Sequence, residues 1–317
     1  MSDDDQAGGR PPRARRPTRR RVLGYGLGGL AGLATAGAGG VELVAHGLLP
    51  GRYALARLDG ACNASGPTVT FGSPGPSFSA TFYSRARRRQ VGYTIGYPPG
   101  HGRGDQLPLI IALHGFGGSH RSAGMWSVEQ ALAMRVDGRR LPPMAMVAAD
   151  GGGGYWNPHP GDDPMGMVVD ELIPLCQRLG LGLGTGAGRL GTMGISMGGY
   201  GAILLAEKYP DLFAAAAAIS PAIWTSYAQA RSVNRGAYAS AAAFAWANAV
   251  THAGALSEVA VRVATGLDDP FLPGVRALVA RLPKRAVVDI VQGCHTGSFF
   301  AAQEPLSLAF LGRHLAA

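Results

Sequence analysis

Short apolar runs alternate with amphipathic stretches along most of the chain beyond residue 75. Two of the runs, LPLIIALHG at 107–115 and PMAMVAAD at 143–150, are almost continuously apolar. Such runs are typical of strands that are buried on both faces of a sheet. Further strands are predicted from β-rich or apolar segments at 77–83, 90–97, 189–196, 213–220, 259–266 and 286–293.

Helices are predicted between and after these strands. The stretch 164–180 has amphipathic spacing and ends at Gly180, the stretch 199–210 ends at Pro210, and a last helix runs through 299–315. Alternating strands and helices form parallel βαβ units, so we expect an α/β fold with a mostly parallel central sheet and helices on both faces. Residues 223–256 depart from this alternation and predict a small helical insertion over the functional site.

Composition and charge narrow the possible functions. The 317 residues are 47% hydrophobic and 15% charged, which is enough apolar material for a large core. The net charge is +9, but residues 1–21 hold seven arginines and three aspartates and so contribute +4 of it. The remaining +5 is spread along the chain without a dense basic stripe, so we expect no nucleic-acid partner.

The first 50 residues differ from the rest of the chain. The basic segment RRPTRRR precedes an uncharged run, Val22 to Val41, in which eight of twenty residues are glycine. Arg19 and Arg20 resemble the pair of a twin-arginine export signal. Residues 1–50 are thus predicted to be a twin-arginine-type signal or an N-terminal anchor, residues 51–74 a linker, and residues 75–317 the folded domain. The protein is expected outside the cytoplasm, secreted or membrane-anchored through this segment.

Three cysteines, Cys62, Cys176 and Cys294, are compatible with one disulfide in an oxidising compartment. The sequence alone does not choose the pair. Their spacing matches no zinc signature, so no metal site is predicted.

The sequence GISMG at 194–198 fits the pattern G-x-S-x-G between a predicted strand and a predicted helix. This context is typical of a nucleophile elbow, in which a tight turn raises the hydroxyl of Ser196 above the sheet edge. Side chains at the flanking positions would collide with the packed strand and helix, which explains the glycines there. The helix that follows directs its N-terminal N–H groups at developing negative charge.

A nucleophilic serine needs a base and a group that orients the base. His295 follows the predicted strand 286–293 and precedes the last helix, so it is the candidate base. His252 lies in the insertion and His314 near the end of the last helix, which makes both less suitable. Asp269, which Pro270 biases toward extended geometry, is the candidate acid, with Asp268 as the alternative.

An oxyanion formed during acyl transfer needs preorganised N–H donors. Met197, directly after the serine, and Phe116, in the glycine-rich segment HGFGG after an early strand, are the candidate donors. His114 in the same segment is interpreted as a brace for the loop. Trp156, in the glycine-rich loop 151–163, is a candidate substrate contact.

Four of these segments, LHGFGG, SMGGYGA, GLDDPF and GCHTGSFF, together resemble the bacterial esterase family that includes S-formylglutathione hydrolases, feruloyl esterases and antigen 85 mycolyltransferases. The resemblance covers roughly residues 75–315. It implies an α/β-hydrolase fold and a catalytic triad of Ser196, Asp269 and His295. Phe299 and Phe300 follow the histidine where members of the family often have a tryptophan.

The expected function is therefore an exported serine esterase that hydrolyses carboxylic or thioesters through an acyl-enzyme on Ser196. No metal or organic cofactor is implied, and the partner is a small-molecule or cell-envelope ester. Two alternatives stay open. A cell-envelope acyltransferase would pass the acyl group to a sugar hydroxyl instead of water, and a surface binding protein would keep the fold without catalysis.

Overall fold

The structure is a computed structural model, and it describes residues 60–183 and 190–316. The predicted signal or anchor at 1–50 and the first part of the predicted linker, 51–59, lie outside the described residues. Within the described ranges, every helix is too short or too polar to span a lipid bilayer.

Eight strands form the central sheet, in the order β11-β10-β9-β8-β4-β7-β3-β2. They are β2 (Ser77–Ser84), β3 (Arg89–Gly96), β4 (Leu109–Leu113), β7 (Ala145–Ala149), β8 (Leu190–Ile195), β9 (Ala215–Ile219), β10 (Ala260–Gly266) and β11 (Val287–Val291). The strands from β11 to β7 pair in parallel, and β3 pairs antiparallel with both β7 and β2. The sheet is mostly parallel, as the alternating pattern predicted.

Helices connect most of the parallel strands. They are α4 (Val128–Leu132), α5 (Pro164–Gly166), the π-helical turn η1 (Met167–Leu172), α6 (Ile173–Gln177), α7 (Met197–Lys208), α8 (Tyr227–Val233), α9 (Ala241–Trp246), α10 (Ala249–His252), the 3₁₀ turn η3 (Ala253–Ser257), α11 (Leu272–Val279) and α12 (Gly297–Leu315). The stretch predicted as one helix at 164–180 is the continuous run from α5 to α6.

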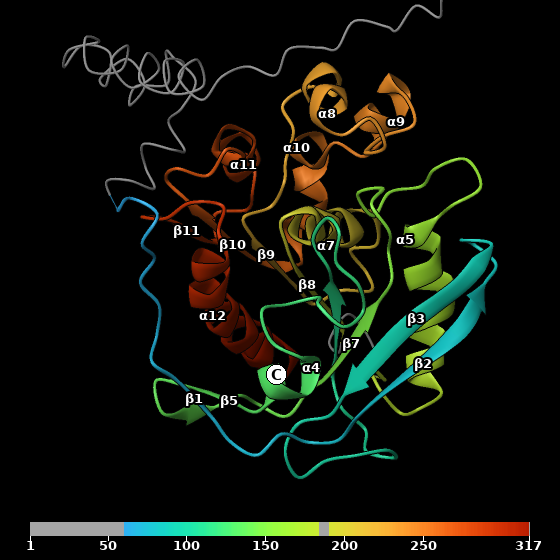
Figure 1. Cartoon of the computed structure of the whole chain (residues 1–317), viewed down its shortest axis with the longest axis vertical. Helices are drawn as coiled ribbons and strands as arrows, with labels where there is room; N and C mark the ends of the chain where they lie inside the picture. The colour runs from blue at the N-terminus through green and yellow to red at the C-terminus, as the bar shows by residue number, and fades with distance from the viewer. Residues whose placement is uncertain (1–59, 184–189, 317) are drawn as a thin grey trace, which may run out of the picture. The chain divides into compact units, whose positions relative to one another are not determined.

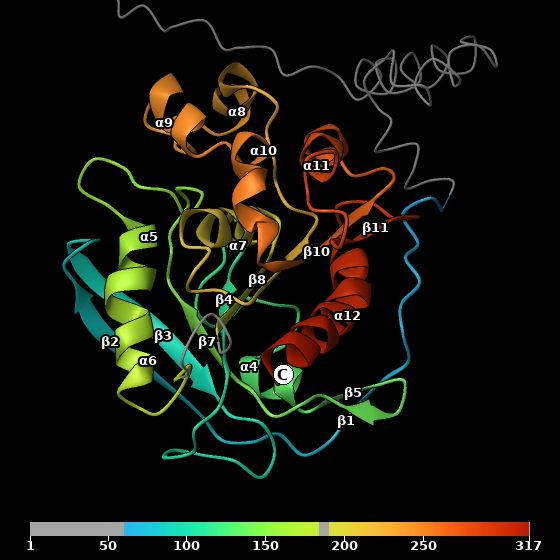
Figure 2. The same ribbon diagram turned by 180° about the vertical axis from the view of Figure 1, so that it is seen from behind.

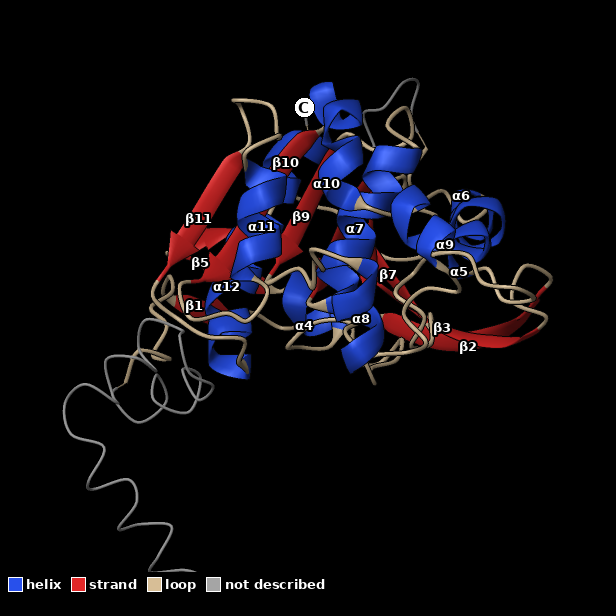
Figure 3. Ribbon diagram, turned by 90° about the horizontal axis from the view of Figure 1, so that it is seen from above, coloured by secondary structure: helices blue, strands red, loops and turns tan. Residues whose placement is uncertain are grey.

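The sheet is covered by helices on both faces. One face packs against α5 to α6, α7 and the insertion helices, and the other packs against α4 and α12. Figure 1 shows the order of the strands, Figure 2 shows α5 and α6 lying over β2 and β3, and Figure 3 shows α11, α10 and α7 side by side. This arrangement confirms the predicted fold class.

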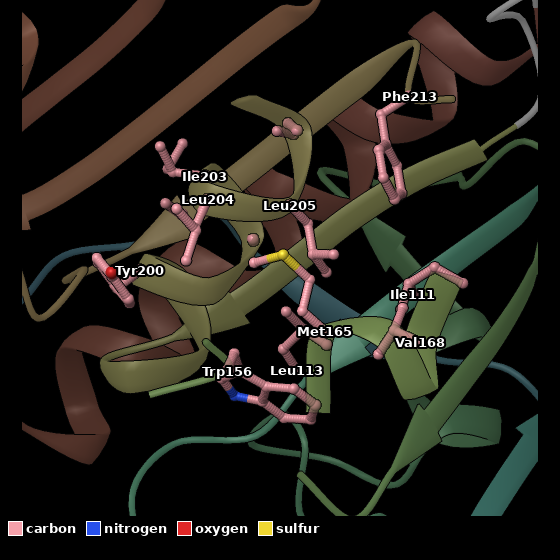
Figure 4. Packing of buried hydrophobic residues seen from close by; sticks show 14 of the residues in the cluster. Ile111, Leu113, Trp156, Met165, Val168, Tyr200, Ile203, Leu204, Leu205 and Phe213 are labelled. Carbon is pink, nitrogen blue, oxygen red and sulfur yellow. The ribbon is translucent and has the colours of Figure 1, made fainter. Parts of the chain in front are cut away.

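Alternate residues of a single strand enter the two cores. Ile111 and Leu113 of β4 belong to the core beneath α7, whereas Ile110 and Ala112 belong to the core beneath α12. Figure 4 shows Ile111 and Leu113 among the side chains that α7 contributes. Burial on both faces explains why the strand sequences are continuously apolar rather than alternating.

The helical insertion predicted at 223–256 is present as α8, α9, α10 and η3, between β9 and β10. It contacts the glycine-rich loop 151–163, because Asn157 Nδ2 donates to the carbonyl of Ala237 at 2.9 Å. This hydrogen bond connects the insertion to the loop.

A second, small sheet was not predicted. It consists of β1 (Val69–Phe71), β5 (Met134–Val136) and β6 (Arg139–Arg140), paired antiparallel in the order β1-β5-β6. β1 lies in the segment predicted to be a linker, 51–74. The part of that segment from residue 60 onward therefore runs along the folded domain, where Figure 1 shows it passing α12.

Candidate active site

Ser196 lies in the sharp turn between β8 and α7, as the G-x-S-x-G pattern predicted. Its backbone has a φ of 58° and a ψ of −118°, a conformation that is strained for any residue with a side chain. The N–H of Ser196 donates to the carbonyl of Ile219 at 2.9 Å, and its carbonyl accepts from the N–H of Tyr200 at 3.0 Å. These bonds hold the backbone of the turn and leave the hydroxyl free to point out of it.

The glycines around Ser196 are required by backbone contacts. A Cβ on Gly194 would clash with the backbone of Gly198, and a Cβ on Gly198 would clash with the carbonyl of Leu113. Helix α7 thus begins against the ends of β8 and β4 at a separation that only glycine permits.

We expect Gly198→Ala to destabilise the protein by about 3 kcal/mol, because the neighbouring atoms are backbone and cannot rotate away. Chemical denaturation of the purified variant measures this loss. Gly254→Ala is the matched control, since a Cβ at Gly254 meets nothing within 4 Å. Equal stability of the two variants would contradict the packing argument.

His295 lies in the short connection between β11 and α12 and faces Ser196. Its Nε2 is 2.9 Å from the Oγ of Ser196, and its Nδ1 is 2.9 Å from Oδ2 of Asp269. Both contacts are satisfied when Nδ1 carries the proton and donates to the carboxylate. Nε2 is then free to accept the serine proton.

Asp269 has a fully buried side chain, and its second oxygen, Oδ1, accepts from the N–H of Phe271 at 2.8 Å. The neighbouring Asp268, which the sequence left as the alternative acid, has its N–H bonded to the carbonyl of Gly293 at 3.0 Å. The carboxylate that accepts the hydrogen bond from the imidazole therefore belongs to Asp269.

Two aromatic rings enclose the imidazole. The ring centroids of Phe271 and Phe300 lie 5.2 Å and 5.1 Å from that of His295. Phe300 is one of the two residues that follow the histidine in place of the tryptophan expected from the family. Phe299, the other, is fully buried in the core beneath α12.

The two candidate oxyanion donors come from the turn that carries the serine and from the loop after β4. Met197 is the first residue of α7, so its N–H has no acceptor within the helix. Phe116 follows Gly115, at which an added Cβ would be 3.8 Å from the Cβ of Ser196. The structure thus brings the loop after β4 beside the serine. The side chain of Phe116 is 66% exposed, so its ring stands at the rim of the site.

The ring of Trp156, predicted as a substrate contact, is fully buried and does not reach the surface. Its Nε1 donates to the carbonyl of His114 at 3.2 Å, and it fills a slot where a Cβ on Gly151 or Gly201 would clash. Figure 4 shows the indole next to Leu113 and Met165. This finding corrects the prediction: Trp156 supports the loop from below, because the glycines around it leave room for the ring.

His114 has the bracing position that the sequence indicated. Its Nδ1 donates to the carbonyl of Gly115 at 2.7 Å, and its Nε2 accepts from the N–H of Gly151 at 2.9 Å. Burial lowers the pKa of this imidazole, so the neutral form is favoured. His114 therefore links the loop after β4 to the loop after β7.

A shallow groove of about 170 Å³ opens beside Ser196. Its lining residues carry no charged side chain: they are Gly115, Phe116, Gly118, Ser122, Ala123, Gly124, Met125, Ile195 and Phe300. A larger cavity of about 400 Å³ lies between the small sheet and the loop after β3, and none of the candidate site residues lines it. We assign the reaction to the smaller groove because Ile195, which precedes Ser196, and Phe300, whose ring contacts His295, line it.

Sequence reasoning missed Glu304, which holds one wall of this groove. Its carboxylate, on α12, accepts from the N–H of Met125 at 2.6 Å and packs against Gly124. Burial raises the pKa of Glu304 to about 7. The sequence did carry one signal for Glu304, because it is an acidic residue within the apolar pattern of 299–315.

Glu304 should make stability depend on pH in an unusual direction. The pKa of Glu304 is higher in the folded than in the unfolded protein, so folding favours the protonated carboxyl. The contribution of Glu304 to the stability of the fold is therefore complete at low pH and is lost as pH rises toward and through 7. Glu304→Gln keeps an acceptor for Met125 without the charge. We expect this variant to exceed the wild type by about 3 kcal/mol at pH 8 and to match it near pH 4.5. Denaturant unfolding at the two pH values measures the difference, and a pH-independent difference would contradict the assignment.

In the part of the chain that the structure describes, no three His, Cys, Asp or Glu side chains gather closely enough to hold a metal ion.

The three hydrogen-bonded residues, Ser196, Asp269 and His295, come from separate connections, after β8, β10 and β11. These connections lie at the carboxyl edge of the parallel strands, where α/β sheets bind their ligands.

A family of esterases, described as "Putative esterase", matches residues 84–286. The chain belongs to this esterase family. It is accordingly a serine hydrolase that acts on ester bonds. The matched region contains Ser196 and Asp269 and ends shortly before His295.

Solved structures of esterases share the fold. A ferulic acid esterase is 18% identical and superposes with a TM-score of 0.63 over 75% of this chain and 98% of the esterase. S-formylglutathione hydrolase from Agrobacterium tumefaciens is 16% identical, with a TM-score of 0.61 over 80% and 100%. The feruloyl esterase module of Clostridium thermocellum, in an S954A mutant complexed with sinapinate, is 14% identical, with a TM-score of 0.56 over 80% and 96%. None of the curated proteins compared with the chain matches it.

Proposed function

We propose that this esterase is an exported enzyme that hydrolyses small esters through a covalent acyl-enzyme on Ser196. The observation that carries the proposal is the continuous hydrogen-bonded path from Ser196 through His295 to Asp269. Nucleophile, base and orienting acid in this arrangement are the elements of serine acyl transfer.

The reaction proceeds in two halves. The Oγ of Ser196 attacks the ester carbonyl while His295 Nε2 takes its proton, and Asp269 stabilises the imidazolium that results. The imidazolium then protonates the leaving alcohol, and the acyl group stays on Ser196. In the second half, His295 removes a proton from water, which attacks the acyl-enzyme. The bond between the acyl group and Oγ of Ser196 breaks, His295 returns the proton to Oγ, and the acid is released.

The charge that develops on the carbonyl oxygen is stabilised by backbone donors. We infer that the N–H groups of Met197, at the start of α7, and of Phe116, in the loop after β4, are these donors, and the N-terminus of α7 adds its dipole. Donors fixed by backbone need no reorganisation during the reaction, which makes their contribution large.

The groove beside Ser196 favours a substrate whose ester carries a small, uncharged group that binds there. Its volume of about 170 Å³ suits a short acyl chain or a single ring, and its lining side chains are apolar or hydroxylic. A structural relative, a feruloyl esterase module, was solved in complex with sinapinate. Long acyl chains would have to extend past Phe116 and Met125, which are both exposed.

The experiment uses the full chain, purified from cells that export it, and a series of chromogenic esters with acyl groups from acetyl to long-chain. We expect the highest kcat/KM for short or single-ring acyl groups. Addition of alcohols and sugars as acceptors tests the acyltransferase alternative, in which transfer product would replace the free acid. Absence of any ester turnover, together with no labelling of Ser196 by a fluorophosphonate, would overturn the proposal.

Export through a twin-arginine signal predicts a specific dependence on Arg19 and Arg20. This pathway recognises the arginine pair, so we expect replacement of both by lysine to leave the protein in the cytoplasm. Immunoblots of cytoplasmic and extracytoplasmic fractions measure the distribution. The control is the lysine replacement of Arg10 and Arg13, which keeps the same net charge and lies outside the pair. Unchanged export of the first variant would leave a general signal or an anchor as the explanation.

A further inference from the structure

The connection that carries His295 lies at the edge of the sheet. It follows β11, which pairs with β10 on one side and whose outer residues Val287 and Val291 are exposed. Ser196 and Asp269, in contrast, follow strands that have neighbours on both sides. Of the three groups, the imidazole therefore has the least support from the sheet itself.

One side of this connection is held by the loop that carries Asp269. The N–H of Leu267 donates to the carbonyl of Val291 at 2.9 Å, and the N–H of Asp268 donates to the carbonyl of Gly293 at 3.0 Å. The two loops are in close contact here, because a Cβ on Gly266 would clash with the backbone of Gly293.

The other side is held by a covalent bond. Cys62 and Cys294 form a disulfide with a Cα–Cα distance of 4.7 Å across 232 positions of sequence. Cys294 is fully buried and directly precedes His295. The bond thus attaches the backbone next to the imidazole to the segment that enters the domain from the N-terminal side.

Other contacts also join the segment around Cys62 to the end of β11 and to α12. Gln292 Nε2 donates to the carbonyl of Gly60 at 3.4 Å, which is a long hydrogen bond. Further along, the backbone of Gly66 approaches Ala302 on α12 so closely that a Cβ would lie 2.8 Å from its Cα. The disulfide differs from these contacts because it is covalent and attaches at the residue directly before His295.

We propose that the Cys62–Cys294 disulfide positions His295, so that the enzyme reaches full turnover only when the bond is formed. This inference rests on the proposed function, because it assigns His295 as the base. Its physical basis is that proton transfer demands accurate placement: a misplacement of about 1 Å can lower a rate by about 100-fold. Cys62 and Cys294 are then positioning residues that act through the imidazole.

Formation of the Cys62–Cys294 bond requires an oxidant, and another disulfide can serve as that oxidant. When the bond forms, the two thiols lose two electrons and two protons to an oxidised disulfide, which leaves as a dithiol or two thiols. Dithiothreitol reverses the step by supplying two electrons and two protons as it closes into its cyclic disulfide. Oxidising compartments outside the cytoplasm keep such bonds formed.

The test compares wild type, reduced wild type and Cys62→Ser, with Cys176→Ala as the matched control. Cys176 is a buried free cysteine, and burial raises the pKa of its thiol to about 12, so it takes little part in thiol exchange. Each kcat is expressed per folded molecule, with the folded fraction measured by near-UV circular dichroism on the same sample. Intact mass after alkylation reports whether the bond is present.

We expect reduction and Cys62→Ser each to lower kcat by about tenfold or more with KM within about twofold, since the base acts only in the transition state. Reoxidation with oxidised glutathione should restore the wild type and leave Cys62→Ser unchanged. Cys176→Ala should keep the wild-type kcat and its loss on reduction. The labelling rate with a fluorophosphonate should fall in parallel with kcat.

Three results would overturn the inference: an unchanged kcat in the reduced, folded protein, a change confined to KM, or complete unfolding on reduction. The last would mean that the bond supports the whole fold rather than the histidine. Ser196→Ala separates this outcome from failure of the proposed function. If the oxidised wild type is labelled and Ser196→Ala is not, the nucleophile stands whatever the disulfide does.

Discussion

Replacement of Ser196 by alanine is expected to lower ester turnover by about four orders of magnitude or more while the fold stays intact. The substitution removes only the Oγ that faces His295 Nε2 at 2.9 Å, and without it no acyl-enzyme can form. The backbone bonds of the turn, from Ser196 to Ile219 and Tyr200, do not involve the side chain. Alanine can therefore keep the same turn.

The measurement is kcat/KM for a short chromogenic ester, with the melting temperature recorded on the same preparation. Ser232→Ala is the control, because this serine lies on α8 and bonds to the carbonyl of Gln229 in its own helix. Turnover that persists in folded Ser196→Ala would remove the serine from the mechanism. A melting temperature far below that of the control would show that the turn needs the hydroxyl.

Most of the sheet could be predicted because burial on both faces leaves a strong signal. The strands β4, β7 and β9 are short, fully buried apolar runs, so each of them is recognisable by itself. The small sheet left no such signal: β1 has three residues and β6 has two, too few for any periodicity. Pairing with the distant β5 defines β1, whereas β6 pairs with β5 across the turn at Asp137 and Gly138.

The candidate site was predictable where chain order and turn chemistry constrain it. Gly194 and Gly198 mark the turn because backbone fills the space beside them, and His295 follows the last strand. The choice between Asp268 and Asp269 was open because the two are neighbours in sequence. A hydrogen bond of 2.9 Å to the imidazole distinguishes them, and that is a property of the folded loop.

Other features of the site depend on contacts between distant segments. Three cysteines allow three pairings, and the segment of Cys62 has no pattern that would place it beside Cys294. Trp156 was misjudged for a related reason. A tryptophan in a glycine-rich loop suggests a pocket wall, but Gly201 on α7 provides a slot that the sequence of the loop does not reveal.

The disulfide also refines the expectation for protein kept in the cytoplasm. An enzyme whose base is positioned by a bond between Cys62 and Cys294 would be made in a less active form there. The export that we propose would then be coupled to activation, because transfer to an oxidising compartment supplies the conditions for the bond.

Asp269→Asn should lower kcat by about four orders of magnitude, whereas Asp268→Asn should lower it by less than about tenfold. An asparagine at 269 keeps the size of the side chain but loses the charge that stabilises the imidazolium. Its amide can also donate to Nδ1 and so favour the tautomer that presents a proton to Ser196. The backbone contact of Asp268, from its N–H to the carbonyl of Gly293, survives in its own variant.

The same substitution at adjacent positions makes each variant the control of the other. Steady-state kinetics with one ester and a melting temperature for both proteins are sufficient. The loss at 269 should be in kcat rather than KM, because the carboxylate acts on the base and does not line the groove. A reversed ranking would mean that Asp268 orients His295 in the working enzyme, and equal losses would mean that both carboxylates are needed to hold the loop.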